Sequence, residues 1–162
     1  MTRFRISGLS AEPFRHLYGL SDEALAAAGV RRCVVDARPG FPDRVEMRDG
    51  EPGETMLLLN ITHQPADSPY RASHAIFVRE GAETAFETTD DVPQVLRIRT
   101  LSVRAFDAAG DMLDADLVDG GQLEGAIGRM FENAAIEYLQ LHYATRGCYA
   151  ARVDRLTHQA AG

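Results

Sequence analysis

The clearest hydrophobic pattern in the chain is the run TMLLLNITH at residues 55–63. Leu57, Leu59 and Ile61 alternate with Met56 and Leu58, so both faces of an extended segment carry apolar side chains. Two apolar faces are typical of a strand in the interior of a sheet that is covered on both sides. We therefore predict a central strand here.

Alternating or short apolar segments predict further strands. They lie at residues 3–9, 30–37, 74–80, 96–106, 112–118 and 135–143, with a last, less regular one at 148–155. Between 106 and 112, the sequence DAAGD indicates a hairpin loop with Gly110 in the left-handed region. The two prolines and the glycine of RPGFPDR, residues 38–44, break regular structure.

Helix signals are fewer. SDEALAAAG, residues 21–29, begins with a capping Ser21 and ends at Gly29. Residues 121–133 carry apolar side chains at i, i+4, i+7 and i+8 from Leu123, which predicts an amphipathic helix. A third helix is predicted over residues 10–19.

These elements predict an α+β fold. About seven strands follow one another mostly in hairpin order, so we expect a mainly antiparallel, curved sheet, of which a barrel is one form, with about three helices. The length of 162 residues suits a single domain over residues 1–162.

The charged residues exclude several functions. All 17 basic residues are arginine, so a Schiff-base lysine and a P-loop lysine are impossible. The net charge of −7 disfavours nucleic acids and anionic membranes as partners. No apolar run reaches membrane-spanning length and the N-terminal residues show no signal-peptide pattern, so we expect a cytoplasmic protein. Cys33 and Cys148 are then reduced thiols.

The stretch HQPADSPYRASH, residues 63–74, is the first candidate site. Pro65 and Pro69 stiffen it. The Arg71 guanidinium is suited to a carboxylate or phosphate, and the hydroxyls of Ser68 and Tyr70 can add hydrogen bonds. The alternative is structural: Arg71 pairs with an acid of the chain itself.

Two histidines lie near the ends of predicted strands. His63 and His142 become neighbours if their strands do, and one of them is then a candidate general base. With His74 or Cys148 they offer zinc ligands, but no HxH or HxxxH spacing supports a metal. We therefore expect no metal and no cofactor, and a hydrogen-bonded structural role is the alternative for each histidine.

The segment RGCYAAR, residues 146–152, is the last candidate. In a strand, Cys148 and Arg152 share a face, and a thiol beside arginines can be reactive. The alternative is a small buried thiol behind a turn at Gly147.

Four segments of the chain resemble the bacterial family DUF1203, whose function is unknown. They are RPGFPDRV, EPGETMLLLN, HQPADSPYRASHAIFVRE and GCYAARVDR. The resemblance implies a single-domain bacterial protein and no particular activity. The residues that match the family pattern are His63, Ser68, Pro69, Tyr70, Arg71, Phe77, Val78, Arg79, His142, Gly147, Cys148 and Arg152.

The chain departs from that resemblance at three positions. Asp43 stands where cysteine is common, Tyr143 where asparagine is common and His74 where glycine is common. If the residue at position 43 pairs with Cys148 in relatives, that thiol pair is absent here.

We therefore expect a domain that binds a small anion, carboxylate or phosphate, in one polar cleft. The loop 63–74, the RPGFPDR turn and the RGCYAAR segment would form it, with Arg71 and Arg152 facing each other. One alternative is a small enzyme with a histidine general base at the same site. The other is a non-catalytic structural or interaction protein, for which a homodimer is the expected state.

Overall fold

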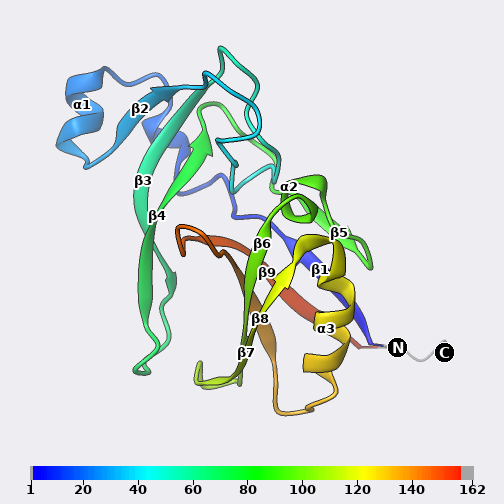
Figure 1. Cartoon of the computed structure of the whole chain (residues 1–162). Coiled ribbons are helices and arrows are strands. Elements are labelled where there is room, and N and C mark those ends of the chain that lie inside the picture. Colours follow the sequence, from blue (N-terminus) through cyan, green and yellow to red (C-terminus); the bar gives the residue numbers. More distant parts are fainter. Residues whose placement is uncertain (1, 158–162) are drawn as a thin grey trace, which may run out of the picture.

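A computed structural model describes residues 2–157 and has an α+β fold with two antiparallel sheets (Figure 1). The larger sheet has the strand order β5-β1-β9-β8-β6-β7 and the smaller has the order β2-β3-β4. The strands are β1 (Arg3–Ser7), β2 (Arg31–Val34), β3 (Thr55–Gln64), β4 (Ala72–Arg79), β5 (Glu87–Thr89), β6 (Thr100–Phe106), β7 (Met112–Asp119), β8 (Tyr138–Tyr143) and β9 (Tyr149–Leu156). The helices are α1 (Asp22–Ala27), α2 (Gln94–Arg97) and α3 (Leu123–Phe131), with 3₁₀ turns η1 (Arg15–Leu17) and η2 (Gly120–Gln122).

The larger sheet forms its core against α3, which lies across one of its faces (Figure 1). The predicted apolar stripe of α3 is buried there, including Leu123 and Ile127. Leu139, Leu141 and Tyr143 of β8 enter the same core, so the alternation that predicted their shared face is confirmed. Burial of each such side chain contributes about 1.5–3 kcal/mol.

The smaller sheet forms a second core with the N-terminal segment. β3 lies between β2 and β4, which confirms the predicted central strand. Met56 and Leu57 point to opposite faces and are both fully buried. Ser21 caps α1 by accepting a hydrogen bond from the backbone N–H of Ala24, also as predicted.

The segment 41–49 connects the two sheets through backbone hydrogen bonds. The backbone N–H of Arg44 donates to the carbonyl of Phe77 in β4, and the carbonyl of Arg44 accepts from the N–H of Leu9, just after β1. Gly8 makes this approach possible, because a Cβ atom there would lie 2.3 Å from the carbonyl oxygen of Val45. The irregular backbone predicted for RPGFPDR is therefore the connection between the sheets.

The expected antiparallel sheet is open: the larger sheet ends at β5 and β7 and does not close into a barrel within the described residues. Two expectations differ from the structure. Residues 10–19 form turns around the single 3₁₀ turn η1 in place of a helix, and the buried Ala11, Phe14 and Leu17 recur every three residues, the 3₁₀ period. The strand predicted to start at residue 96 starts at Thr100, because α2 follows Pro93 and buries its own apolar side chains.

None of the helices among residues 2–157 is suited to cross a membrane. The longest, α3, has 9 residues, whereas a span needs about 20.

Glu80 gives the smaller sheet a pH dependence that can be measured. Its carboxylate accepts from Arg32 at 2.8 and 2.9 Å and from the hydroxyl of Thr55. The Arg32 guanidinium lowers the pKa of Glu80 from its ordinary 4.5 to about 2. A lowered pKa means that the carboxylate stabilises the fold above its ordinary pKa and that this stability is lost as the pH falls towards the lowered one.

We predict that Glu80→Gln lowers the free energy of unfolding by about 1–3 kcal/mol at neutral pH. The difference from wild type should shrink as the pH falls from about 5 to about 3 in urea denaturation curves. Glu83→Gln is the control, because Glu83 is an exposed partner of Arg15 and should change little. A difference that stays constant with pH would contradict this role for Glu80.

Candidate functional site

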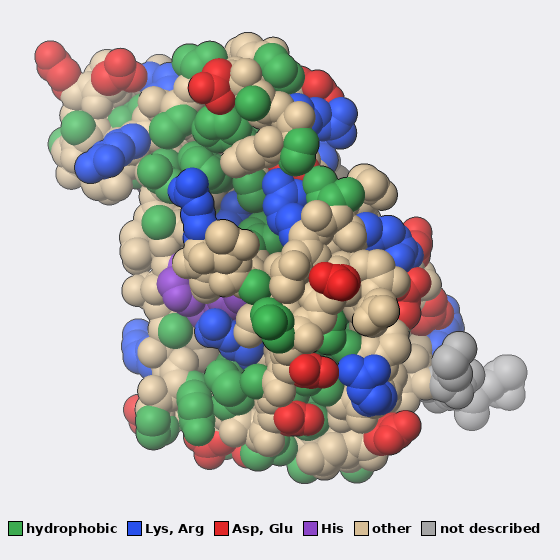
Figure 2. Space-filling model, viewed as in Figure 1, with side chains coloured by type: hydrophobic (Ala, Val, Ile, Leu, Met, Phe, Trp, Pro, Cys, Tyr) green, Lys and Arg blue, Asp and Glu red, His purple; other side chains and the backbone are tan. Residues whose placement is uncertain are grey.

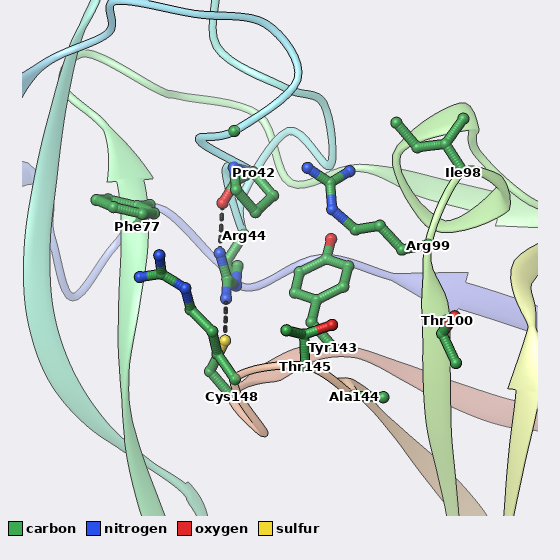
Figure 3. A pocket seen from close by; sticks show the side chains of 12 residues that line it. Pro42, Arg44, Phe77, Ile98, Arg99, Thr100, Tyr143, Ala144, Thr145 and Cys148 are labelled. Atoms are coloured by element: carbon green, nitrogen blue, oxygen red, sulfur yellow. Dashed lines mark hydrogen bonds between the residues drawn. The ribbon is translucent and has the colours of Figure 1, made fainter.

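A cavity of about 500 Å³ opens between the two sheets (Figure 3). It lies where the segment 40–44, strand β4, the start of β6 and the turn after β8 meet. We call it the arginine pocket. Its lining residues are Gly40, Pro42, Arg44, Phe77, Ile98, Arg99, Thr100, Tyr143, Ala144, Thr145, Arg146 and Cys148.

Arg44 forms the buried wall of this pocket, with 1% of its surface exposed. Its Nε donates to the carbonyl of Tyr149 at 2.8 Å, and its Nη2 lies 3.1 Å from the sulfur of Cys148. A third bond reaches the carbonyl of Pro42. No carboxylate among residues 2–157 forms an ion pair with Arg44. Its charge is therefore buried with neutral partners alone, an arrangement that is costly without a counter-ion.

The other two arginines of the pocket differ in their pairing. Arg99 holds the carboxylate of Asp49 with both terminal nitrogens, at 2.6 and 2.9 Å. Asp49 is itself buried. Its negative charge cancels the positive charge of Arg99, so the pair is neutral overall. Arg146 has no ion-pair partner in the part of the chain that the structure describes. The pocket thus contains two positive charges without a carboxylate partner among the described residues, the buried one of Arg44 and the exposed one of Arg146.

Tyr143 places a phenol between two of these arginines (Figure 3). The guanidinium carbons of Arg44 and Arg99 lie 4.9 and 5.1 Å from its ring centroid. Its hydroxyl is buried and has no hydrogen-bond partner among the described residues. Burial raises the pKa of Tyr143 to about 12, and the two arginines oppose that shift. The phenol stays protonated at neutral pH and is free to donate.

The lining is suited to binding an anion more than to moving protons. It offers guanidinium groups, the Tyr143 phenol and the hydroxyls of Thr100 and Thr145 as donors. No histidine or carboxylate is among the residues that line it in the described structure.

The predicted loop 63–74 is shorter than expected, because β3 runs to Gln64 and β4 begins at Ala72. Within it, the Ser68 hydroxyl donates to the carbonyl of Gly110 at 2.9 Å. Arg71 donates to the carbonyl of Pro65, not to an acid of the described chain. Tyr70 is 41% exposed. None of the three hydroxyl and guanidinium residues lines the arginine pocket.

Cys148 and Arg152, the two candidates of the RGCYAAR segment, lie in different surroundings. Cys148 lines the arginine pocket beside Arg44. Arg152 is exposed, lies 4.1 Å from the Tyr138 ring centroid and pairs with Asp154. The expected cleft therefore includes the RPGFPDR turn and the start of RGCYAAR but not the loop that carries Arg71.

Asp43 has a structural role at the position where the family resemblance favours cysteine. It is fully buried, and its carboxylate accepts from the backbone N–H groups of Val45, Glu46 and Arg79. Burial raises its pKa, while those three donors lower it. Asp43 thus fixes the backbone on either side of Arg44 relative to β4.

His63 and His142 are close neighbours, although their strands β3 and β8 belong to different sheets and do not pair. His74 joins them, and the ring centroids of the three lie 4.6, 5.0 and 5.3 Å apart. Burial, with a smaller effect of the Arg104 charge, lowers the pKa of all three, that of His142 to about 3. All three imidazoles are therefore neutral near pH 7.

Sequence patterns alone do not reveal Arg99 or the pairing state of Arg44. Arg44 belongs to a turn whose prolines marked it as irregular, and nothing local shows that its side chain is buried. Tyr143 carried a weak signal, because its alternation with Leu141 and Leu139 placed it on the core face of β8.

The unpartnered Tyr143 hydroxyl leads to a stability prediction. Removal of a buried hydroxyl without a partner removes a desolvation cost, so Tyr143→Phe should leave the free energy of unfolding unchanged or raise it by up to about 1–2 kcal/mol. Equilibrium denaturation measures this, with Tyr138→Phe as control because that hydroxyl accepts from Gln64 and its loss should destabilise. A decrease of more than about 1 kcal/mol in Tyr143→Phe would show that the hydroxyl has a partner.

Comparison with known proteins identifies the family. The family model described as "Protein of unknown function (DUF1203)" matches residues 40–155. No curated protein and no solved structure matches the chain significantly. The matched range includes the whole arginine pocket and the three clustered histidines. Since the match spans more than half of the sequence, this chain belongs to the DUF1203 family.

Proposed function

We propose that this domain binds a small organic anion, a carboxylate or a phosphate ester, in the arginine pocket. The observation that carries the proposal is the presence of two guanidinium groups, Arg44 and Arg146, that face one cavity without a carboxylate partner among the described residues.

The charges in the pocket favour an anionic ligand. Arg44 uses its N–H groups on two carbonyls and one sulfur, and a guanidinium has five N–H donors in all. An anion near Arg44 and Arg146 would supply the missing negative charge beside a buried guanidinium. The Tyr143 hydroxyl would gain the acceptor that it lacks.

The size and walls of the pocket indicate an organic anion rather than a bare ion. A volume of about 500 Å³ lies in the range of small-molecule sites. Phe77 and Ile98 add apolar surface at opposite ends of the cavity, with Arg44, Tyr143 and Arg99 between them (Figure 3). A ligand with one anionic group and one apolar part would contact both kinds of surface.

This proposal keeps the ligand class expected from the sequence and changes its place. The loop with Ser68, Tyr70 and Arg71 contributes no side chain to the pocket. An enzyme with a histidine base at the same site has less support, because the histidine cluster lies outside the lining residues.

We also propose that the protein works in the bacterial cytoplasm and does not bind nucleic acid. Both cysteines are free, as in a reducing compartment, and the net charge is −7. The homodimer and the single domain over residues 1–162 stay predictions.

Arg146→Gln tests the place of the anion site. Saturating phenyl phosphate should raise the melting temperature of wild type by about 5–10 °C, and inorganic phosphate should need a higher concentration for the same shift. Arg146→Gln should fold normally and lose most of the shift, because the exposed end of Arg146 is not tied to other described residues.

Arg71→Gln is the matched control. It removes the arginine of the loop 63–74 and should leave the phenyl phosphate shift unchanged. If Arg71→Gln loses the shift and Arg146→Gln keeps it, the anion binds at the loop. If wild type shows no shift with phenyl phosphate, phosphate or succinate, the proposal is wrong.

A further inference from the structure

Three histidines from distant parts of the sequence form a second cluster, which we call the histidine cluster. His63 lies at a bulge in β3, His74 lies in β4, and His142 lies in β8 of the other sheet, opposite a bulge in the neighbouring strand β9. One nitrogen of each imidazole can be chosen so that all three lie within 4.8 Å of one another. Histidine side chains reach the surface at the waist between the two sheets (Figure 2).

Gln140 determines which nitrogen of His63 carries the proton. The Gln140 amide N–H₂ donates to the backbone carbonyl of His63 at 2.9 Å, which fixes the orientation of the amide. The Gln140 Oε1 atom can then only accept, and it lies 2.8 Å from Nδ1 of His63. Nδ1 is therefore the donor, and Nε2 of His63 carries a lone pair. That Nε2 is buried and has no partner among the described residues.

Gly147 fixes His142 in the same way. Nδ1 of His142 lies 3.0 Å from the carbonyl of Gly147, which can only accept, so Nδ1 carries the proton. Nε2 of His142 then carries the lone pair. It lies 3.4 Å from Oε1 of Gln140, an acceptor as well, so this contact provides no hydrogen bond.

His74 completes the set. Its Nδ1 is buried and has no partner in the described structure. Its ring stacks on His63 with a centroid distance of 4.6 Å and an interplanar angle of 4°. Buried polar atoms are nearly always satisfied, so two orphan nitrogens in one cluster need an explanation.

We propose that the histidine cluster binds one divalent transition-metal ion, with Zn²⁺ as the best-suited probe. The ligands are Nε2 of His63, Nδ1 of His74 and Nε2 of His142. Three neutral imidazoles are suited to Zn²⁺ and its neighbours in the first transition row, and not to Ca²⁺ or Mg²⁺. The hydrogen bonds from His63 to Gln140 and from His142 to Gly147 are the outer-shell contacts that orient such ligands.

Metal binding requires a small closure of the cluster. Tetrahedral Zn²⁺ with Zn–N bonds of about 2.0–2.1 Å places its ligand nitrogens about 3.3–3.4 Å apart. One nitrogen of each ring lies within 4.8 Å of the other two, so the three rings must move closer together to share one ion. The bulge in β3 puts His63 itself at an irregular point of its strand, where such an adjustment is easier, and the bulge in β9 interrupts the pairing of β8 next to His142.

Arg104 indicates what occupies the fourth position. Its Nε donates to the Ser102 hydroxyl at 3.2 Å, and it has no ion-pair partner among residues 2–157. A positive charge near the cluster disfavours a bare dication. It favours a metal whose open position holds an anion, such as hydroxide or a carboxylate, that also faces Arg104.

This inference is independent of the arginine pocket and replaces the expectation of no metal. That expectation relied on local histidine spacing, whereas the three ligands are 11 and 68 residues apart along the chain, from 63 to 74 and from 74 to 142.

Calorimetric titration of the chelator-treated full chain with Zn²⁺ tests the site. Wild type and the control His16→Ala, whose histidine is exposed in η1 outside the cluster, should bind one equivalent. His74→Ala should weaken binding by at least about tenfold, the lower end of what loss of an outer-shell partner alone does. His74→Phe keeps a ring stacked on His63 and serves as the second variant if His74→Ala is poorly folded.

Co²⁺ provides the spectroscopic readout. A three-imidazole site should give visible absorption bands without a thiolate-to-cobalt charge-transfer band. A charge-transfer band would assign the ion to Cys33 or Cys148 and overturn the proposal. So would a wild type that binds no Zn²⁺, or equal Zn²⁺ affinities in wild type and in folded His74→Phe.

Discussion

The rest of the structure depends on the contacts by which Arg44 joins the two sheets. Its backbone pairs with β4 of the smaller sheet and with the segment after β1, and its buried guanidinium reaches the carbonyl of Tyr149 in β9 of the larger sheet. One residue therefore joins two separately packed cores. The same side chain leaves a buried positive charge without a carboxylate at that junction, so the contact that holds the sheets together also supplies the charge on which the proposed anion binding depends.

The turn after β8 links the two proposed sites. On one side of it, Arg146 and Cys148 line the arginine pocket. On the other, the carbonyl of Gly147 fixes the tautomer of His142 in the histidine cluster. Gly147 has a φ of 80°, in the left-handed region that favours glycine, so this turn keeps its shape at little cost. The few residues of this turn thus help to position both the arginines of the pocket and the imidazole nitrogens that carry lone pairs in the histidine cluster.

The sequence predicts the elements better than their assembly. Period-two alternation identified β3, β4 and β8, because strand faces follow directly from local order. It did not separate the strands into two sheets, since β2–β4 and the larger sheet share the same antiparallel hairpin signals. At the site, sequence patterns indicate the RPGFPDR and RGC segments but favour Arg71 over Arg44 as the arginine that binds an anion. Burial of an arginine depends on long-range packing, and local sequence shows only that a turn is present.

The most direct test of the account is a ¹H–¹⁵N NMR spectrum of the arginine side chains during titration with phenyl phosphate. Each Nε–H group reports on its own guanidinium, and the Nε–H of Arg44 is held in the interior by the carbonyl of Tyr149. The account predicts that the Arg44 and Arg146 signals shift together and saturate at one equivalent, while the Arg71 signal stays in place. A shift of Arg71 alone, or unchanged Arg44 and Arg146 signals at saturating phenyl phosphate, would contradict it.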